Sequence, residues 1–378
     1  MIYLDSAATT LQKPGEVARA SSWAIRHMAS PGRGGHRPAM AAAEVVYACR
    51  EAAAQLFQVP DPEQVVFTFN ATHGLNIAIK TLVKPGGRVV ISGYEHNAVT
   101  RPLHAIPNVE VRVARGPLFD PKATADAFRQ ALEQPTDAVV CTQVSNVFGY
   151  VLPVKEISLL CREKGVPLIV DASQAAGCVP VSYLELGAAF IAMPGHKGLY
   201  GPQGTGILLC RDGGDCILEG GTGSNSRFAD MPDFLPDRLE AGTHNVAGIA
   251  GLLEGIRYVQ RQGVDTIRAH ESRLIRAMGA GLNQMPGVTA YQALRRPDCQ
   301  SGVLSFRVSG WDCEELAGEL GQRGVAMRAG LHCAPLAHET AGTLETGTIR
   351  ASVSAFNTMW EIRRFLGELP RLLGQQKP

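Results

Sequence analysis

Lys197 and Asp171 are the residues of this sequence whose types and surroundings point most directly to chemistry. Lys197 lies in the glycine-rich stretch 192–206, and Asp171 directly follows the apolar run 166–170. A lysine amine can form a Schiff base with an aldehyde, and a carboxylate beside a pyridine nitrogen keeps that nitrogen protonated, so that the ring can accept electrons. The pair therefore predicts pyridoxal 5'-phosphate as the cofactor, with both residues in contact with it.

Both residues also have ordinary structural explanations. Most lysines are solvated surface charges, and an aspartate followed by Ala-Ser-Gln174 suits a helix N-cap. Capping explains Asp171 but not the lysine that accompanies it. The flanking glycines favour the cofactor, because glycine lets the backbone approach a phosphate or a ring closely. These glycines stand at positions 195, 198, 201 and 204.

A third segment could hold the phosphate group. Asn70–Asn76 follows the strand-like run Val65–Phe69 and opens the helix-like span Ile77–Leu82. The N-terminus of a helix offers N–H groups to an anion. Thr72 and Gly74 make this turn a plausible phosphate seat.

Composition limits the class of protein. The 378 residues, 45% of them hydrophobic, suffice for two domains or for one large domain with a satellite. Thirty-six basic residues against 35 acidic ones, with no Lys/Arg block, argue against nucleic acid as a partner. Asp5 stands where a secretory peptide would be basic or apolar, and no apolar run reaches membrane-spanning length, so we expect a cytoplasmic protein without a membrane partner. Nine cysteines without a Cys-x-x-Cys pair disfavour zinc and a disulfide framework, and we expect no metal site.

Alternating strand-like and helix-like segments predict an α/β fold. Helix-like spans such as 153–165, which ends on a glycine suited to a C-cap, separate several short apolar runs, as in a mostly parallel sheet. Ligands of such sheets collect at the carboxyl ends of the strands, where Asp171 falls. The seven apolar runs are 65–67, 88–91, 109–113, 138–141, 167–170, 188–191 and 206–209.

The C-terminal third reads as a smaller α+β unit. One long helical pattern begins at Val246, and a second runs from 267 to 282. The stretch 220–237, polar and rich in glycine, reads as a long loop. We divide the chain into a large cofactor-binding domain, 15–250, and a small domain formed by 1–14 and 251–378. The elements expected in the C-terminal part are strands at 303–308, 325–328 and 348–353, a helix at 313–323, and a last helix with one apolar face from 362 to 369.

Over nearly its whole length the sequence resembles the cysteine desulfurases of the class V aminotransferase group. The motif around Cys333 and the short stretch 333–350 resemble the second desulfurase group, which acts in sulfur mobilisation with a sulfur-accepting partner. The motifs that carry the resemblance stand in the family's order: Tyr3–Ala8, Ala71-Thr72, Glu95-His96, Ser145-Asn146, Asp171-x-x-Gln174, Gly195-His-Lys197, Glu240–Asn245, Arg328–Ala334 and Arg350–Ser352.

This resemblance implies the pyridoxal phosphate-dependent transferase fold type I, with a mostly parallel seven-stranded sheet in the large domain. It also implies roles for individual residues. His96 would stack on the cofactor ring and help to move protons, and Gln174 would bond the ring hydroxyl. The phosphate would be held by Thr72 and His196, joined by Thr243 from the second subunit of a homodimer. Further contacts would come from Ala71 and Asn146 to the cofactor, and from Arg350, Asn146, Ala8 and His36 to the substrate, whose carboxylate suits a guanidinium fork.

Cys333 is the candidate nucleophile. It follows His332 in a loop with Gly330 and Pro335 rather than in an apolar run. Nearby positive charge, including Arg328, would favour its thiolate, whereas a buried thiol would behave as a small inert hydrophobe.

Two positions depart from the family's pattern. Pro194 stands where a serine is usual, and it offers the phosphate neither a hydroxyl nor an N–H group. Leu331 stands where the second group usually has a histidine, two residues before Cys333. The first departure affects how the phosphate is held, and the second affects the polarity around the Cys333 thiol.

The function that the resemblance implies is a cysteine desulfurase, which converts L-cysteine to L-alanine and passes a persulfide on Cys333 to an acceptor protein or thiol, for example in iron–sulfur cluster assembly. The alternatives on the same scaffold are a selenocysteine lyase acting on L-selenocysteine, a cysteine or cystine C–S lyase, and a class V aminotransferase. From another class, a degenerate, non-catalytic sulfur-binding or regulatory homologue is the alternative.

Overall fold

A seven-stranded sheet forms the centre of the computed structural model, which describes residues 1–32 and 34–374. The strand order is β2-β8-β7-β6-β5-β3-β4. The pairs from β4 to β7 are parallel, whereas β8 runs antiparallel to both of its neighbours, so the prediction of a mostly parallel sheet is confirmed. The strands are β2 (Val65–Thr68), β3 (Arg88–Ser92), β4 (Glu110–Ala114), β5 (Ala138–Thr142), β6 (Leu168–Asp171), β7 (Phe190–Pro194) and β8 (Gly206–Cys210).

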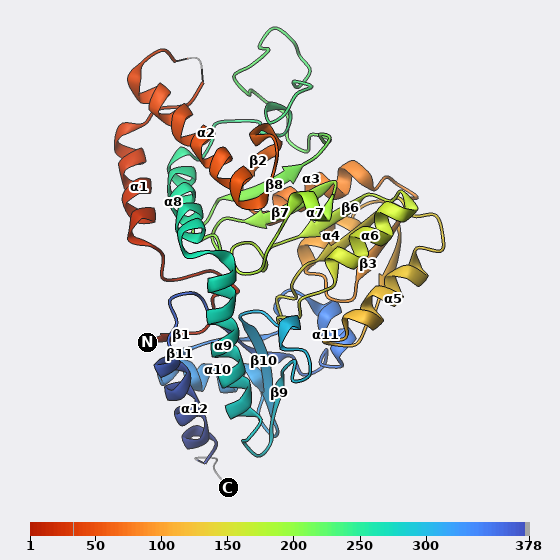
Figure 1. Cartoon of the computed structure of the whole chain (residues 1–378), viewed down its shortest axis with the longest axis vertical. Coiled ribbons are helices and arrows are strands. Elements are labelled where there is room, and N and C mark those ends of the chain that lie inside the picture. The colour runs from red at the N-terminus through yellow and green to blue at the C-terminus, as the bar shows by residue number, and fades with distance from the viewer. Residues whose placement is uncertain (33, 375–378) are drawn as a thin grey trace.

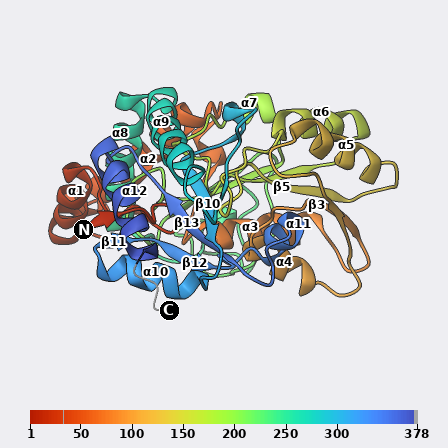
Figure 2. The ribbon, with the colours of Figure 1, turned by 90° about the horizontal axis from the view of Figure 1, so that it is seen from below.

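Helices cover both faces of this sheet (Figures 1 and 2). On one face lie α5 (Pro121–Ala131) and α6 (Val154–Lys164), and on the other lie α3 (Ala71–Leu82) and α4 (Asn97–His104). Because both faces are covered, strands such as β5 and β6 are buried at every residue, which is why they appear in the sequence as continuous apolar runs. The helix α6 ends at the left-handed Gly165, as predicted.

Three helices form a separate layer beside the β2 edge of the sheet (Figure 1). The helix α8 (Val246–Gln262) packs against α1 (Gly15–His27) and α2 (Arg37–Phe57). After Gly263 the chain continues as α9 (Val264–Leu282), which runs down to the C-terminal part of the molecule. Shorter helical segments are α7 (Tyr183–Leu186) and the 3-10 turns Pro62–Gln64, Asp237–Leu239 and Pro297–Cys299.

The C-terminal part is built on an antiparallel sheet of order β12-β13-β10-β9. A second small sheet joins the two ends of the chain, because β1 (Ile2–Tyr3) pairs in parallel with β11 (Val325–Ala326). The remaining elements are β9 (Val288–Tyr291), β10 (Val303–Val308), α10 (Cys313–Gln322), β12 (Arg328–Gly330), α11 (Pro335–Ala341), β13 (Thr348–Ser352) and α12 (Met359–Leu373).

One expectation for this region was wrong in detail, and one strand was missed. The single strand expected at 325–328 is two strands, β11 and β12, which belong to different sheets. The strand β9 was not expected, because its residues are at most half-buried and give only a short apolar signal. The long loop after β8 is confirmed, since no helix or strand occurs before the 3-10 turn at Asp237.

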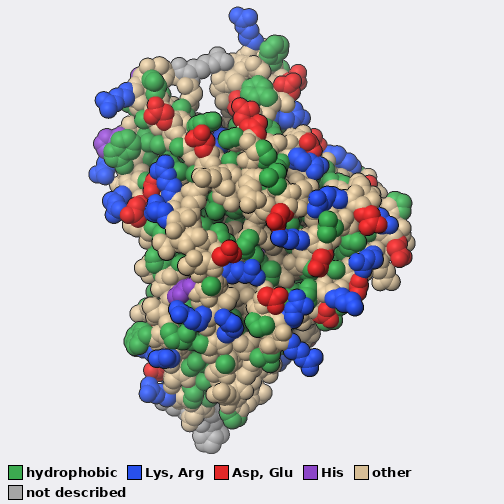
Figure 3. All heavy atoms as spheres, viewed as in Figure 1, with side chains coloured by type: hydrophobic (Ala, Val, Ile, Leu, Met, Phe, Trp, Pro, Cys, Tyr) green, Lys and Arg blue, Asp and Glu red, His purple; other side chains and the backbone are tan. Residues whose placement is uncertain are grey.

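The surface carries charges of both signs. On the face drawn in Figure 3, Lys/Arg and Asp/Glu side chains are interspersed rather than gathered into blocks. None of the helices in the described ranges combines the length and the apolar composition that a bilayer crossing requires.

Candidate active site

A pocket at the carboxyl ends of the parallel strands contains most of the predicted site residues. It encloses about 700 Å³ of empty space, part of it open to solvent. Asp171 is the last residue of β6, and the loop after β7 carries His196 and Lys197. The predicted residues that line it are Ala8, Ala71, Thr72, His96, Asn146, Asp171, Gln174, His196 and Lys197. We call it the Lys197 pocket.

The Lys197 amine is strongly affected by its surroundings. Burial is the main cause that lowers its pKa from 10.5 to about 8; the nearby carboxylate of Asp171 opposes this lowering, and Arg350 adds to it. At pH 7 about a tenth of such a lysine is then the free amine, the form that reacts with an aldehyde, whereas a solvated lysine is almost wholly protonated. Because Asp171 affects the pKa of Lys197, the lysine and the aspartate predicted from the sequence lie close together.

The pocket has donors and a carboxylate that suit pyridoxal phosphate. Asp171 is buried, and its Oδ1 accepts a hydrogen bond from the Ser173 N–H at 2.9 Å. At the start of α3, the side chain of Asn70 caps the His73 N–H, whereas Ala71 and Thr72 belong to the first turn, whose N–H groups have no acceptor within the helix. A phosphate bound there would satisfy them.

His96 is the N-cap of α4 and lies next to Asn97, which bonds the loop of Cys333. Its Nδ1 accepts the Ala98 N–H at 3.0 Å, so the neutral ring carries its proton on Nε2. Burial lowers the pKa of His96, and Asp171 opposes that effect. The next residue, Asn97, donates its N–H to the carbonyl of Cys333 at 2.7 Å.

The loop of Cys333 is held in an unusual backbone conformation beside the pocket. His332 and Cys333 have φ angles of +49° and +55°, in the left-handed region that costs a side-chain-bearing residue about 1–3 kcal/mol. The Asn146 amide donates to the His332 carbonyl at 2.8 Å, which ties the loop to the pocket. Among the nine cysteines, all within the described ranges and all free, Cys333 is the exposed one.

The positive charge expected beside Cys333 does not come from its neighbour His332. That ring is buried, and burial together with Arg350 lowers its pKa to about 2, so it is neutral. Two arginines lower the pKa of that ring and so lie near the loop: Arg350 and, with a smaller effect, Arg328. Burial lowers the pKa of Arg350 itself, and its ion pair with Asp5 opposes this.

Arg350 is buried on β13 and does not line the Lys197 pocket. Its Nη2 donates to Asp5 at 2.9 Å, and its Nη1 donates to the carbonyl of Asn146 at 3.0 Å. Its Nε and the Oδ1 of Asn146 are buried and have no hydrogen-bond partner in the described part of the chain. The arginine predicted to bind the substrate thus has an internal ion pair and a buried Nε–H group that these residues do not use.

The N-terminal segment closes one side of the pocket. Gln174 donates to the carbonyl of Ala7 at 2.9 Å, so its amide is bound to this segment rather than free. The ring Nδ1 of His196 lies 3.0 Å from the hydroxyl of Thr9, and the N–H of Thr10 donates to the His196 carbonyl at 3.2 Å.

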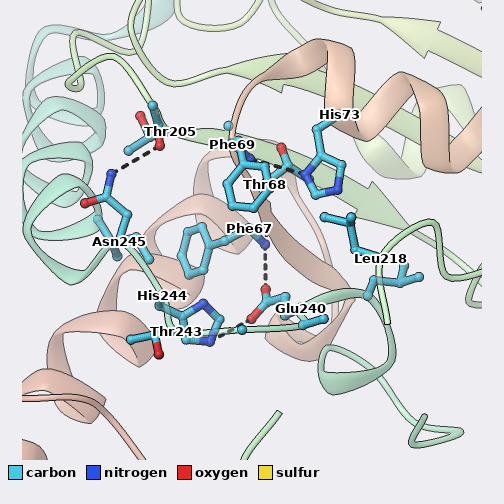
Figure 4. A pocket seen from close by; sticks show the side chains of 16 residues that line it. Phe67, Thr68, Phe69, His73, Thr205, Leu218, Glu240, Thr243, His244 and Asn245 are labelled. Atoms are coloured by element: carbon cyan, nitrogen blue, oxygen red, sulfur yellow. Dashed lines mark hydrogen bonds and ion pairs between the residues drawn. The ribbon is translucent and has the colours of Figure 1, made fainter. Parts of the chain in front are cut away.

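The structure does not bring Thr243 or His36 to the Lys197 pocket. Thr243 lies in another pocket together with His244 and Glu240, on the segment before α8 (Figure 4). Glu240 is buried there in an ion pair with Arg50 on α2, and it also accepts the Phe67 N–H at 2.6 Å. His36 is an exposed residue at the N-cap of α2.

The glycines near Lys197 have a role that the sequence did not reveal. A Cβ on Gly195 would come within 2.2 Å of the Thr205 hydroxyl, and one on Gly198 within 2.4 Å of the Ala176 carbonyl. These glycines therefore let the lysine loop pack against its own chain. Pro194 forms part of the pocket wall at the end of β7, where its ring offers no hydrogen bond.

Several residues at this site were missed or underrated. Thr142, Val144 and Ser173 line the pocket, but their types are common in buried strands and turns. Asp5 was not predicted as a partner of Arg350, and the contact between the two spans most of the chain. Only a comparison of distant segments could have found these contacts.

Comparison with known proteins gives a family and several similar proteins. The family described as aminotransferase class-V matches residues 2–365. A probable cysteine desulfurase of Methanothermobacter thermautotrophicus is 34% identical, over 97% of this chain and 93% of that protein. Another, from Xylella fastidiosa strain Temecula1, is 33% identical, over 98% of this chain and 90% of its own length.

Solved structures agree with the observed fold. The apo cysteine desulfurase of Thermococcus onnurineus NA1 superposes with a TM-score of 0.91 at 29% identity, over 99% of this chain and 95% of that one. The cysteine desulfurase CsdA of Escherichia coli, in an S-sulfonic acid form, gives a TM-score of 0.87 at 26% identity, with the same coverage of 99% and 95%.

Proposed function

This chain belongs to the class V aminotransferase family, and we propose that it is a pyridoxal phosphate-dependent cysteine desulfurase that forms L-alanine and keeps the sulfur of L-cysteine as a persulfide on Cys333. The observation that carries the proposal is the exposed Cys333 thiol in a loop bound to the Lys197 pocket through Asn97 and Asn146. Amino-group transfer requires no such thiol, whereas sulfur transfer does.

The residues of the pocket have complementary parts in this reaction. Bound pyridoxal phosphate would supply an electron sink for negative charge on the substrate. The Lys197 amine would take the proton from the substrate Cα and later return a proton to carbon. Asp171 would hold a proton at the ring nitrogen, and the first turn of α3 with Thr72 and His196 would bind the phosphate.

The sulfur step assigns a nucleophile and a leaving group. The Cys333 thiolate attacks the substrate sulfur, so that an S–S bond forms while the C–S bond breaks. The electron pair of that bond stays on the substrate carbon, which is then protonated. The balance is L-cysteine plus the Cys333 thiol giving L-alanine plus the Cys333 persulfide, and an acceptor thiol or protein removes the outer sulfur.

The proposal extends to the substrate contacts and to the assembly. The unused Nε of Arg350 and the free Oδ1 of Asn146 would bind the carboxylate and the amino group of the substrate. Thr243, which lies outside the Lys197 pocket of its own chain, would complete the phosphate site of the second subunit in a homodimer. Ala8 would contact the substrate at the pocket wall, and His36 would approach it from the second subunit.

The test measures the products made by the wild type, by Cys333→Ala and by the matched variant Cys313→Ala, whose thiol is half-buried on α10. We expect equal amounts of alanine and, with a reductant, sulfide from the wild type and Cys313→Ala, and neither product from Cys333→Ala. Pyruvate and ammonia would instead indicate a C–S lyase, and dependence on a keto acid would indicate an aminotransferase. A protein that takes up no pyridoxal phosphate would be a non-catalytic homologue.

A further inference from the structure

Lys197 lines a second cavity, which also shares Ser173 and Gln174 with the Lys197 pocket. This rear cavity holds about 390 Å³ of empty space between the loops of the seven-stranded sheet and the strands of the C-terminal sheet. Its wall contains several polar side chains, among them Ser6, Cys178, Glu271, Ser301 and Ser354. Lys197 thus belongs to the walls of both the Lys197 pocket and the rear cavity.

Glu271 is the ionisable group of the rear cavity that the desulfurase reaction does not use. It lies on α9 with 3% of its surface exposed, and its Oε1 accepts a weak hydrogen bond from the Cys178 thiol at 3.8 Å. No donor within residues 1–32 and 34–374 is bonded to Oε2. A Cβ on Gly302 would come within 2.5 Å of that oxygen, so the glycine keeps space for the carboxyl group.

A second polar group in this cavity also lacks a partner. The hydroxyl of Ser301 is buried, at 3% exposure of the residue, and has no hydrogen bond to any of the residues that the structure describes. Buried polar groups are nearly always satisfied, and internal water is the usual partner in a polar cavity of sufficient size. Glu271 and Ser301 therefore mark positions for ordered water.

We propose that ordered water in the rear cavity connects Glu271 to the Lys197 amine, and that the Glu271 carboxyl group stores the proton that the lysine exchanges during catalysis. The inference rests on the proposed function, because it assigns a supply of protons to the same lysine. When Lys197 has given a proton to the substrate carbon, an O–H bond of Glu271 breaks and an N–H bond of Lys197 forms, through the water between them. The carboxylate is then reprotonated from solvent.

The electrostatics of the cavity suit this role. The titratable groups that face Glu271 are Cys178 and Tyr200, and burial raises the pKa of both, so neither carries charge near neutral pH. Burial raises the pKa of Glu271 to about 8. The pKa of Lys197 is also about 8. A proton moves between groups of matched pKa at little cost in free energy.

The first test uses the protein without cofactor and does not depend on activity. Infrared titration of the wild type should show the carbonyl band of a buried protonated carboxylic acid at pH 7, which disappears between about pH 7 and 9. Burial also raises the pKa of Glu95 to about 8, so the signal of Glu271 is the difference between variants. Glu271→Gln should therefore lose part of the band, and Glu254→Gln, on the neighbouring α8, should retain all of it. A Glu271→Gln band as strong as that of the wild type at pH 7 would overturn the proposal.

The second test measures the pH profile of alanine formation, because Glu271 acts through Lys197 as a positioning residue. Glu271→Gln should form alanine about tenfold more slowly and lose the alkaline limb of the profile, with KM unchanged. Ser301→Ala, which preserves Glu271, should also form alanine more slowly than the wild type. If Glu271→Gln folds poorly, the rate of Ser301→Ala tests the relay in its place. Rates and profiles equal to the wild type would refute the relay. A wild type without desulfurase activity would instead refute the proposed function. The infrared titration would then still test whether Glu271 is protonated at pH 7.

Discussion

The lowered pKa of Lys197 predicts how the protein takes up its cofactor at different pH values. Burial brings this pKa from 10.5 to about 8. Well below pH 8, the fraction of free amine is then about 300-fold larger than for a solvated lysine, which corresponds to about 3 kcal/mol. Because the free amine is the form that reacts with an aldehyde, the rate of uptake should rise with pH and level off above about pH 8.

The assay adds pyridoxal phosphate to the protein without cofactor and follows the visible absorbance at a series of pH values. Lys197→Ala should not develop the colour, whereas Lys164→Ala, at an exposed position on α6, should behave as the wild type. The carboxylate of Asp171 raises the pKa of the lysine, so Asp171→Asn should move the midpoint to lower pH. A midpoint above pH 10, or a coloured Lys197→Ala protein, would refute the reasoning.

Three further substitutions test other parts of the structure. Arg50→Met leaves the buried carboxylate of Glu240 without its arginine partner, with only His244 and the Phe67 N–H beside it, and should lower the free energy of unfolding by about 3–5 kcal/mol, measured in urea. Gly198→Ala places a Cβ against a carbonyl and should cost about 1–3 kcal/mol, whereas Gly367→Ala, in open space on α12, should leave the protein as stable or more so. Arg350→Lys retains the charge but loses the guanidinium fork, and should raise KM for L-cysteine about tenfold or more in steady-state assays; an unchanged KM would mean that the arginine serves only its internal ion pair.

The parts of the fold that the sequence predicts well are those buried on both faces. The strands β5 and β6 are continuous apolar runs because helices cover them on each side, and Gly165 marks the end of α6 through its left-handed backbone. The strands β11 and β12 could not be separated in this way. One pairs with β1 at the start of the chain and the other with β13, and such pairings leave no local pattern.

The same distinction applies to the candidate site, where local patterns predict some residues and distant packing determines the others. The lysine and the aspartate could be predicted, because Asp171 ends one buried strand, Lys197 follows another, and the ends of parallel strands converge. Glu271 could not, since it stands in a run of polar residues that reads as the solvent face of a helix, and only the packing of α9 buries it. For the same reason the partner of Arg350 was not apparent, because Asp5 lies at the other end of the sequence.

The N-terminal segment explains why residues so far apart act on one lysine. Its Asp5 neutralises Arg350, Ala8 lines the Lys197 pocket, and Thr10 lines the rear cavity while its N–H holds the carbonyl of His196. The segment therefore forms part of the wall of both chambers, and the pairing of β1 with β11 fixes it to the C-terminal part of the molecule. Any change that loosens this pairing should alter the geometry of the arginine and the exposure of the lysine together. The burial that lowers the pKa of Lys197 thus depends on the N-terminal segment as well as on the sheet that carries the lysine.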